Sequence, residues 1–151
     1  MPKVLIVYAT WTGNSKEIAE VAANSFKEKD CEVQLSDCLQ VKAEAFLAVD
    51  ICVIATYTYG SEGNLPFEME GFYEELEELD LSGKVFGTLG SGERFYGYFC
   101  KAAIDFDELF EAVGAIRGAN VVKIELGPNE EDRKHIARFA ADLIKTHQGL
   151  K

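Results

Sequence analysis

Residues 4–15 of the chain read VLIVYATWTGNS, an apolar run followed at once by a loop of small polar residues. A short, continuous apolar run is typical of a β-strand that is buried on both faces of a parallel sheet. Apolar residues then recur at helical spacing from Ile18 to Phe26. This stretch therefore predicts a strand, a turn and a helix in direct succession, as in a β-α-β unit.

The same alternation continues along the chain. Apolar runs or alternating patterns predict further strands at residues 31–35, 51–55, 84–89 and 121–126. Apolar residues at intervals of three or four predict further helices at residues 66–79, 103–113 and 130–145. Alternating strands and helices predict an α/β fold, in which helices cover both faces of an open parallel sheet. Because 151 residues are enough for one domain only, we expect a single domain over residues 1–151.

The charge of the chain is strongly acidic and unevenly spread. There are 26 acidic and 15 basic residues, which give a net charge of −11. Residues 43–83 hold no Lys or Arg but ten of the acids, so most of the excess lies in this segment. The balance argues against nucleic acid and anionic membrane as partners, since both attract Lys and Arg. The acidic segment is interpreted either as a solvated helix face or as a docking face for basic partners.

Other features of the sequence argue against a membrane-spanning protein, a secreted protein and a zinc site. No apolar run approaches the roughly 20 residues that cross a bilayer, and the first residues lack the layout of a signal peptide, so we expect a cytoplasmic protein. The cysteines are far apart and lack the spacing of a zinc site, which predicts reduced thiols that act as small apolar residues. These cysteines are Cys31, Cys38, Cys52 and Cys100.

The loop after the first strand has the composition of a phosphate site. In open parallel sheets ligands bind beyond the carboxyl ends of the strands, and free N–H groups at a helix N-terminus bind anions. The alternative is a simple helix N-cap, for which Ser, Thr and Asn are preferred. A cap needs one such residue, whereas five of the six residues from Thr10 to Ser15 are Thr, Gly, Asn or Ser, which favours the phosphate site.

The loops after the third and fourth strands, residues 56–64 and 90–99, are rich in Tyr, Phe and Gly. Aromatic side chains from two facing loops can enclose a flat ring, or they can pack back onto the sheet. Gly90 and Gly92 partly imitate a dinucleotide-binding fingerprint, but Phe95 stands where its third glycine belongs, so this signal is weak.

Three motifs together resemble flavodoxins, and the resemblance runs along the whole chain. The length is similar to that of the short-chain, bacterial-type members. The motifs are Thr10-x-Thr12-Gly13-Asn14-Ser15, Thr58-Tyr59-Gly60 and Gly92-Glu93-x-x-Tyr96-Gly97-Tyr98-Phe99-Cys100. The resemblance implies a flavodoxin-like three-layer sandwich, with a five-stranded parallel sheet of order 2-1-3-4-5 and noncovalent FMN where the strand order reverses.

The resemblance also implies roles for individual residues. The first motif would hold the FMN phosphate, Tyr59 and Tyr96 would flank the two faces of the flavin ring, and the Gly60 carbonyl would turn toward the flavin N5–H on reduction. Tyr59 stands where many members have Trp, and Arg94 adds a cation beside the flavin. The implied cofactor-binding residues are Thr10, Trp11, Thr12, Gly13, Asn14, Ser15, Thr56, Tyr57, Thr58, Tyr59, Gly60, Ser91, Gly92, Glu93, Tyr96, Tyr98, Phe99 and Cys100.

The function implied is that of a low-potential electron carrier rather than an enzyme. Its expected partners are basic-faced redox proteins, such as a ferredoxin/flavodoxin–NADP reductase and acceptor enzymes, which would dock on the acidic face at residues 62–80. We expect a monomer without a metal site. Because nearby acids oppose the negative charge of a reduced flavin, the second reduction potential is expected to lie below that of free FMN.

Two other classes compete with this interpretation. An FMN-dependent NAD(P)H:quinone-type reductase has a related fold, but the sequence supplies neither a nicotinamide site nor a catalytic acid. A flavin-free receiver module shares the strand order, but it needs acids after the first strand and an Asp at the end of the third. Ala9-Thr10 and Ala55-Thr56 occupy those places.

Overall fold

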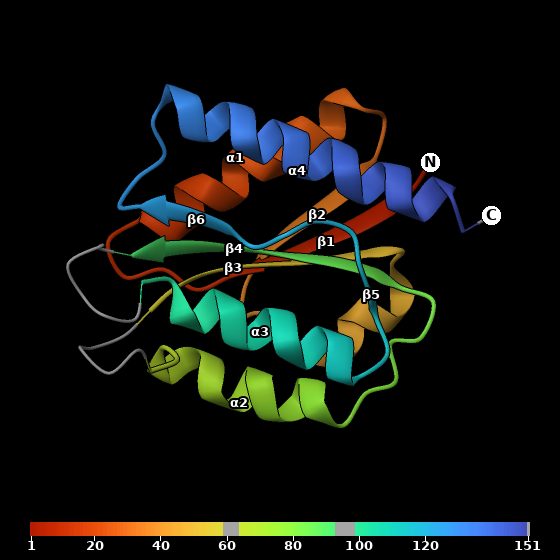
Figure 1. The fold of residues 1–151 in the computed structure, drawn as a ribbon. Coiled ribbons are helices and arrows are strands. Elements are labelled where there is room, and N and C mark those ends of the chain that lie inside the picture. Colours follow the sequence, from red (N-terminus) through yellow and green to blue (C-terminus); the bar gives the residue numbers. More distant parts are fainter. Residues whose placement is uncertain (59–63, 93–98, 151) are drawn as a thin grey trace.

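The computed structural model describes residues 1–58, 64–92 and 99–150. A twisted sheet lies between two layers of helices (Figure 1). The elements are β1 (Lys3–Tyr8), α1 (Asn14–Glu28), β2 (Glu32–Asp37), the 3-10 helix η1 (Ala43–Ala48), β3 (Ile51–Tyr57), α2 (Phe67–Glu77), β4 (Val85–Gly92), α3 (Lys101–Ala112), β5 (Ile116–Arg117), β6 (Val122–Glu125) and α4 (Glu130–Gln148).

The strands pair in parallel in the order β2-β1-β3-β4-β5, which confirms the predicted fold class and strand order. β6 also pairs with β4, so β5 lies beside the first residues of β4 and β6 beside the last. The strand predicted at residues 121–126 is confirmed as β6, whereas the short strand β5 at Ile116–Arg117 was not predicted. Residues 118–121, which interrupt the pairing, include Gly118, Ala119 and Asn120, three weak strand formers.

The strands are buried on both faces because apolar side chains point in both directions. In β1, Val4 and Ile6 lie in a core beneath α1 and α4, whereas Leu5 and Val7 lie in a second core beneath α2 and α3. The second core is the more aromatic of the two. It contains Phe46, Phe72, Phe86, Phe106 and Phe110.

The two helical layers differ in charge. α2, α3 and η1 lie on one side of the sheet and α1 and α4 on the other (Figure 1). The acidic segment 43–83 contains η1 and α2, so its charge falls on the layer that also holds α3. None of the helices in the described ranges is long and apolar enough to cross a membrane.

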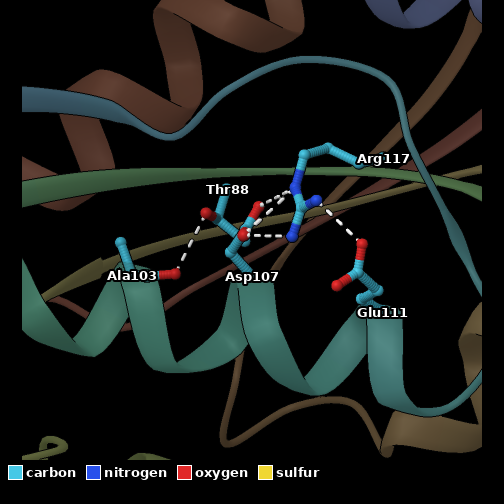
Figure 2. A network of polar contacts seen from close by, with 5 residues as sticks. All are labelled: Thr88, Ala103, Asp107, Glu111 and Arg117. Atoms are coloured by element: carbon cyan, nitrogen blue, oxygen red, sulfur yellow. Dashed lines mark hydrogen bonds and ion pairs between the residues drawn. The ribbon is translucent and has the colours of Figure 1, made fainter.

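Helix α3 is held to the sheet by polar contacts along its length (Figure 2). The Thr88 hydroxyl of β4 donates a hydrogen bond to the Ala103 carbonyl at 3.0 Å. Further along the helix, Arg117 of β5 pairs with Asp107 at 2.7 Å and with Glu111 at 2.8 Å. These contacts fix α3, whose first turn borders the predicted ligand site.

Candidate functional site

The carboxyl ends of the strands meet at one edge of the sheet, where the arrowheads of β4 and β6 point in Figure 1. Tyr8 pairs with Ala55, and Tyr57 pairs with Ser91, so the last residues of β1, β3 and β4 lie side by side. The strand order reverses between β1 and β3, which is where ligands bind in sheets of this kind. The three loops selected from the sequence therefore start at this one place.

The loop after β1 leaves the N-terminus of α1 open. Gly13 adopts a left-handed conformation (φ 95°), and its N–H donates to Thr10 Oγ1 at 2.9 Å. No side chain of the described residues caps α1, so the simple N-cap interpretation does not hold. The first N–H groups of a helix have no partner inside it and carry its positive dipole end. This end of α1 is thus suited to an anion.

The hydroxyl of Ser15 adds a second observation at the same place. Ser15 is 1% exposed, and its Oγ has no hydrogen-bond partner among the described residues. An unsatisfied buried hydroxyl costs about 1–3 kcal/mol, which a bound phosphate oxygen would offset. Around it, Asn14 is half-buried, and Trp11, Thr12 and Gly13 are exposed. The loop therefore fits the phosphate group of a ligand such as FMN.

The side chains at the end of β3 have partners within the protein. Thr56 is buried, and its hydroxyl donates to the Tyr57 carbonyl at 3.0 Å. Tyr57 packs against the core beneath α2 and α3, and its hydroxyl donates to Glu68 Oε1 at 2.7 Å. Thr58 Oγ1 accepts the N–H of Ala102 in α3 at 3.0 Å. Tyr57 thus packs back toward the sheet. This agrees with the second interpretation of the loop aromatic residues, in which they pack onto the sheet and do not enclose a flat ring.

The end of β4 and the start of α3 approach each other closely at Gly90. A Cβ atom at Gly90 would lie 2.9 Å from the Cβ atoms of both Ala103 and Cys100. Gly90 therefore allows helix α3 to pack on the strand, which accounts for it without a dinucleotide site. Cys100 is 1% exposed and forms the N-cap position of α3 with φ 57°, and Phe99 beside it is half-buried.

The loop after β6 also reaches this edge, and sequence analysis did not select it. Ser91 Oγ donates to the Leu126 carbonyl, and the Leu126 N–H donates to the Gly92 carbonyl, both at 2.9 Å. A Cβ atom at Gly127 would lie 3.1 Å from Asn14 Oδ1. The signal that would have found this loop is its position after the fifth strand, at the same edge as the other three.

Several residues of the predicted site lie outside the described residues. Their predicted roles around the flavin ring stay predictions. They are Tyr59, Gly60, Glu93, Tyr96 and Tyr98, together with Glu62 and Arg94 nearby.

Exposed apolar side chains lie on the segments that surround this edge. Trp11 follows β1 and is 74% exposed, Leu39 follows β2 and is 70% exposed, and Phe67 begins α2 and is 81% exposed.

The Cys38 thiol donates to the Glu68 carbonyl at 3.6 Å, which holds the loop after β2 against the start of α2. Burial, reinforced by the charges of nearby acids, raises the pKa of the Cys38 thiol to about 12.

The four cysteines are free thiols, and all are buried, which confirms their predicted role as small apolar residues. Desolvation by burial raises the pKa of Cys31 and of Cys52 as well. The thiols of Cys31, Cys38 and Cys52 are therefore in their neutral form at neutral pH.

Comparison with known proteins places the site in context. The model of the flavodoxin family matches residues 6–139. A flavodoxin of Maridesulfovibrio salexigens is 34% identical over 146 residues, which cover 95% of this chain and 100% of the relative.

Two solved structures are similar to this chain along nearly its whole length. A flavodoxin of Streptococcus pneumonia TIGR4 is 44% identical with a TM-score of 0.93, covering 95% of this chain and 99% of that one. A short-chain flavodoxin associated with a non-canonical PDU bacterial microcompartment is 41% identical with a TM-score of 0.95, covering 97% of this chain and 99% of that one.

Proposed function

The chain belongs to the flavodoxin family, and from this membership we propose that it carries single electrons at low potential between a flavoprotein reductase and acceptor enzymes. Flavodoxins bind FMN and are electron carriers rather than enzymes. When bound, FMN supplies the redox chemistry, and the chain's residues bind it, orient it and set its surroundings. The proposal takes residues 1–151 as a single FMN-binding domain and a monomer.

One observation carries the proposed position of the cofactor: the open N-terminus of α1 beside the buried, unpartnered Ser15 hydroxyl. We place the FMN phosphate there, within reach of the residues from Thr10 to Ser15. Neutral hydroxyl and N–H donors would then hold a dianion in a strongly acidic protein. The flavin ring would lie toward the ends of β3 and β4, between the segments that contain Tyr59 and Tyr96.

The acidic layer supports docking of a basic partner. Helix α2 exposes Glu70, Glu74 and Glu77, and within the described residues no ion pair involves them. Phe67, at the start of the same helix, is almost fully exposed. A partner with basic residues around an apolar patch would complement this surface, and its charge would increase the association rate. We propose the face at residues 62–80 as the docking face.

We also propose that the protein works in the cytoplasm, where thiols stay reduced, in keeping with its four free cysteines. The acids of α2 are further proposed to lower the second reduction potential of bound FMN, since they oppose added negative charge.

The test of this function starts with apoprotein and added FMN. We expect one FMN to bind per chain with quenched fluorescence, and a spectroelectrochemical titration to resolve two one-electron steps, the second below that of free FMN. A protein that leaves the spectrum of added FMN unchanged would contradict the proposal. Steady oxidation of NAD(P)H with a quinone by the purified protein alone would favour the reductase alternative.

A further inference from the structure

A hydrogen bond joins the end of β3 to the start of α3. Thr58 Oγ1 accepts the N–H of Ala102 at 3.0 Å, across 44 residues of sequence. The N-cap residue of α3, Cys100, has a left-handed φ of 57° and forms no side-chain cap. The Thr58 hydroxyl therefore caps the N-terminus of α3 from a distant segment. A Ser or Thr at the N-cap position usually supplies this hydrogen bond for its own helix.

Both partners of this bond are fixed by other contacts. Thr58 directly follows β3, which pairs with β1 on one side and β4 on the other. Helix α3 is held to β4 through Thr88 and to β5 through the pair of Asp107 and Arg117 (Figure 2). The bond therefore connects two rigid parts of the fold at the edge where the ligand is proposed to bind.

The bond also stands at the junction of the two segments assigned to the flavin ring. Thr58 precedes residues 59–63, and Ala102 lies four residues after residue 98. We propose that Thr58 is a positioning residue, whose hydroxyl sets the spacing between the end of β3 and the start of α3 by accepting the Ala102 N–H. This inference rests on the proposed function, since it concerns how the chain prepares a site for FMN.

The physical effect of this bond is preorganisation. A site whose two sides are already fixed loses less conformational freedom when the ligand binds, so the ligand binds more tightly. Loss of a helix cap also frees the first turn of α3, which borders the site. A looser site would confine the ring less and distinguish less strongly between its charge states.

The experiment compares three substitutions in the full-length protein. Thr58→Val keeps the shape of the side chain but removes the acceptor, and Thr58→Ser keeps the hydroxyl. Thr88→Val is the matched control, because Thr88 is also a threonine bonded to α3, at the neighbouring residue Ala103, but it lies in the interior of β4. If Thr58→Val does not fold, Thr58→Ala, which also lacks the hydroxyl, replaces it.

Three quantities are measured: the Kd for FMN, the two reduction potentials, and the exchange rate of the Ala102 amide in the apoprotein by NMR. Thr58→Val is expected to raise the Kd about tenfold, or ~1.4 kcal/mol. It is also expected to move both potentials toward those of free FMN and to speed Ala102 exchange. Thr58→Ser, which keeps the acceptor, and Thr88→Val, which leaves the bond from Thr58 to Ala102 in place, are both expected to change the Kd and the potentials less than Thr58→Val does.

Two results would overturn the inference while leaving the proposed function intact. Equal Kd values and potentials for Thr58→Val and Thr88→Val would mean that Thr58 only stabilises the fold. A weaker affinity of Thr58→Val for FMN with unchanged Ala102 exchange would mean that Thr58 acts by touching the cofactor. Wild-type protein that binds no FMN would instead contradict the proposed function itself.

Discussion

Arg117 and Asp107 form a two-point ion pair between β5 and α3, with Nη2 2.7 Å from Oδ2 and Nε 3.1 Å from Oδ1 (Figure 2). The Asp107 side chain is only 10% exposed, and the guanidinium also lies 5.5 Å from the centroid of the Phe86 ring. The hydrogen bond to Asp107 raises the pKa of Arg117, despite desolvation. The pair thus fixes the short, interrupted edge of the sheet to α3.

We expect Asp107→Asn to lower the free energy of unfolding by about 1.5–3 kcal/mol, the range for hydrogen bonds to charged groups. Urea denaturation of the apoprotein measures the loss. Glu111→Gln is the control, because it removes a charge that pairs with the same Arg117 but is 63% exposed. Exposed pairs contribute about 0–1 kcal/mol, so equal losses for the two variants would contradict a special role for the buried carboxylate.

Ser15→Ala is expected to have opposite effects on the apoprotein and on the FMN complex. In the apoprotein it removes a buried hydroxyl without a partner among the described residues, so the free energy of unfolding should stay level or rise by up to about 1 kcal/mol. In the complex it removes a hydrogen bond to a charged phosphate, so the Kd for FMN should rise about 10- to 100-fold.

Ser25→Ala is the control for Ser15→Ala, since Ser25 lies on the same helix and shares any gain in helix propensity. Its affinity for FMN should match that of the wild type. Urea denaturation and FMN fluorescence titration provide both readouts. If Ser15→Ala weakened the apoprotein and left the Kd unchanged, the phosphate would have to bind elsewhere.

Two glycines that both have space for a Cβ atom should respond in opposite ways to alanine. Gly13 has nothing within 4 Å of that position, but its φ of +95° disfavours any side chain. Gly71 also has nothing within 4 Å and lies inside α2. Gly13→Ala should therefore cost about 1–2 kcal/mol of stability, whereas Gly71→Ala should add about 0.5–1 kcal/mol. Thermal denaturation of the two apoproteins, side by side, would show whether backbone conformation or space decides the effect.

Most of the fold could be predicted from the sequence alone. The apolar runs at β1 and β3 and the helical spacings were sufficient for the fold, because strands buried on both faces and helices with one apolar side are local patterns. The strand at residues 121–126 was predicted correctly, but β5 was missed because its two residues, Ile116 and Arg117, are too few to show a strand pattern. The residues between β5 and β6 include Gly118, Ala119 and Asn120, whose strand propensity is weak.

The candidate site could be predicted only in part, because composition is a local property and contacts between distant segments are not. Composition pointed to the loop from Thr10 to Ser15, since clustered small polar residues at a helix start are unusual. It could not reveal that Thr58 bonds to Ala102, because the acceptor is one hydroxyl among several and the donor is a backbone N–H. Contacts of this kind depend on the packing of distant segments.

The buried thiols predict how stability depends on pH. Burial raises the pKa of Cys38 to about 12, above the value of about 8.5 of an exposed thiol. Because the folded state favours the neutral thiol, its contribution to stability is complete below about pH 8.5 and is lost as the pH rises toward 12.

We therefore expect the free energy of unfolding to fall above about pH 9, and to fall less steeply in Cys38→Ala than in the wild type. Iodoacetamide labelling adds a second measurement. The thiols of folded protein should react far more slowly at pH 8.5 than those of protein unfolded in urea. Parallel pH profiles for the two proteins would contradict this prediction.

The acidic layer predicts a salt-dependent rate of electron transfer. Replacing Glu70, Glu74 and Glu77 of α2 by Gln removes three exposed charges from the proposed docking face. With a ferredoxin/flavodoxin–NADP reductase as donor, we expect the second-order rate constant at low ionic strength to fall about three- to tenfold, because steering by opposite charge is weakened. The difference should shrink as salt is added, since the Debye length is about 10 Å at 0.1 M.

The matched control removes three exposed acids from the opposite helical layer, by Glu→Gln substitution at Glu20, Glu28 and Glu131. Both triple variants have the same net charge, so any difference between their rates reports where the charge lies rather than how much there is. Stopped-flow kinetics across a salt series provides the rates. Equal slowing in the two variants would assign the effect to overall charge, and no slowing in either would leave the acids of α2 a role in solubility alone.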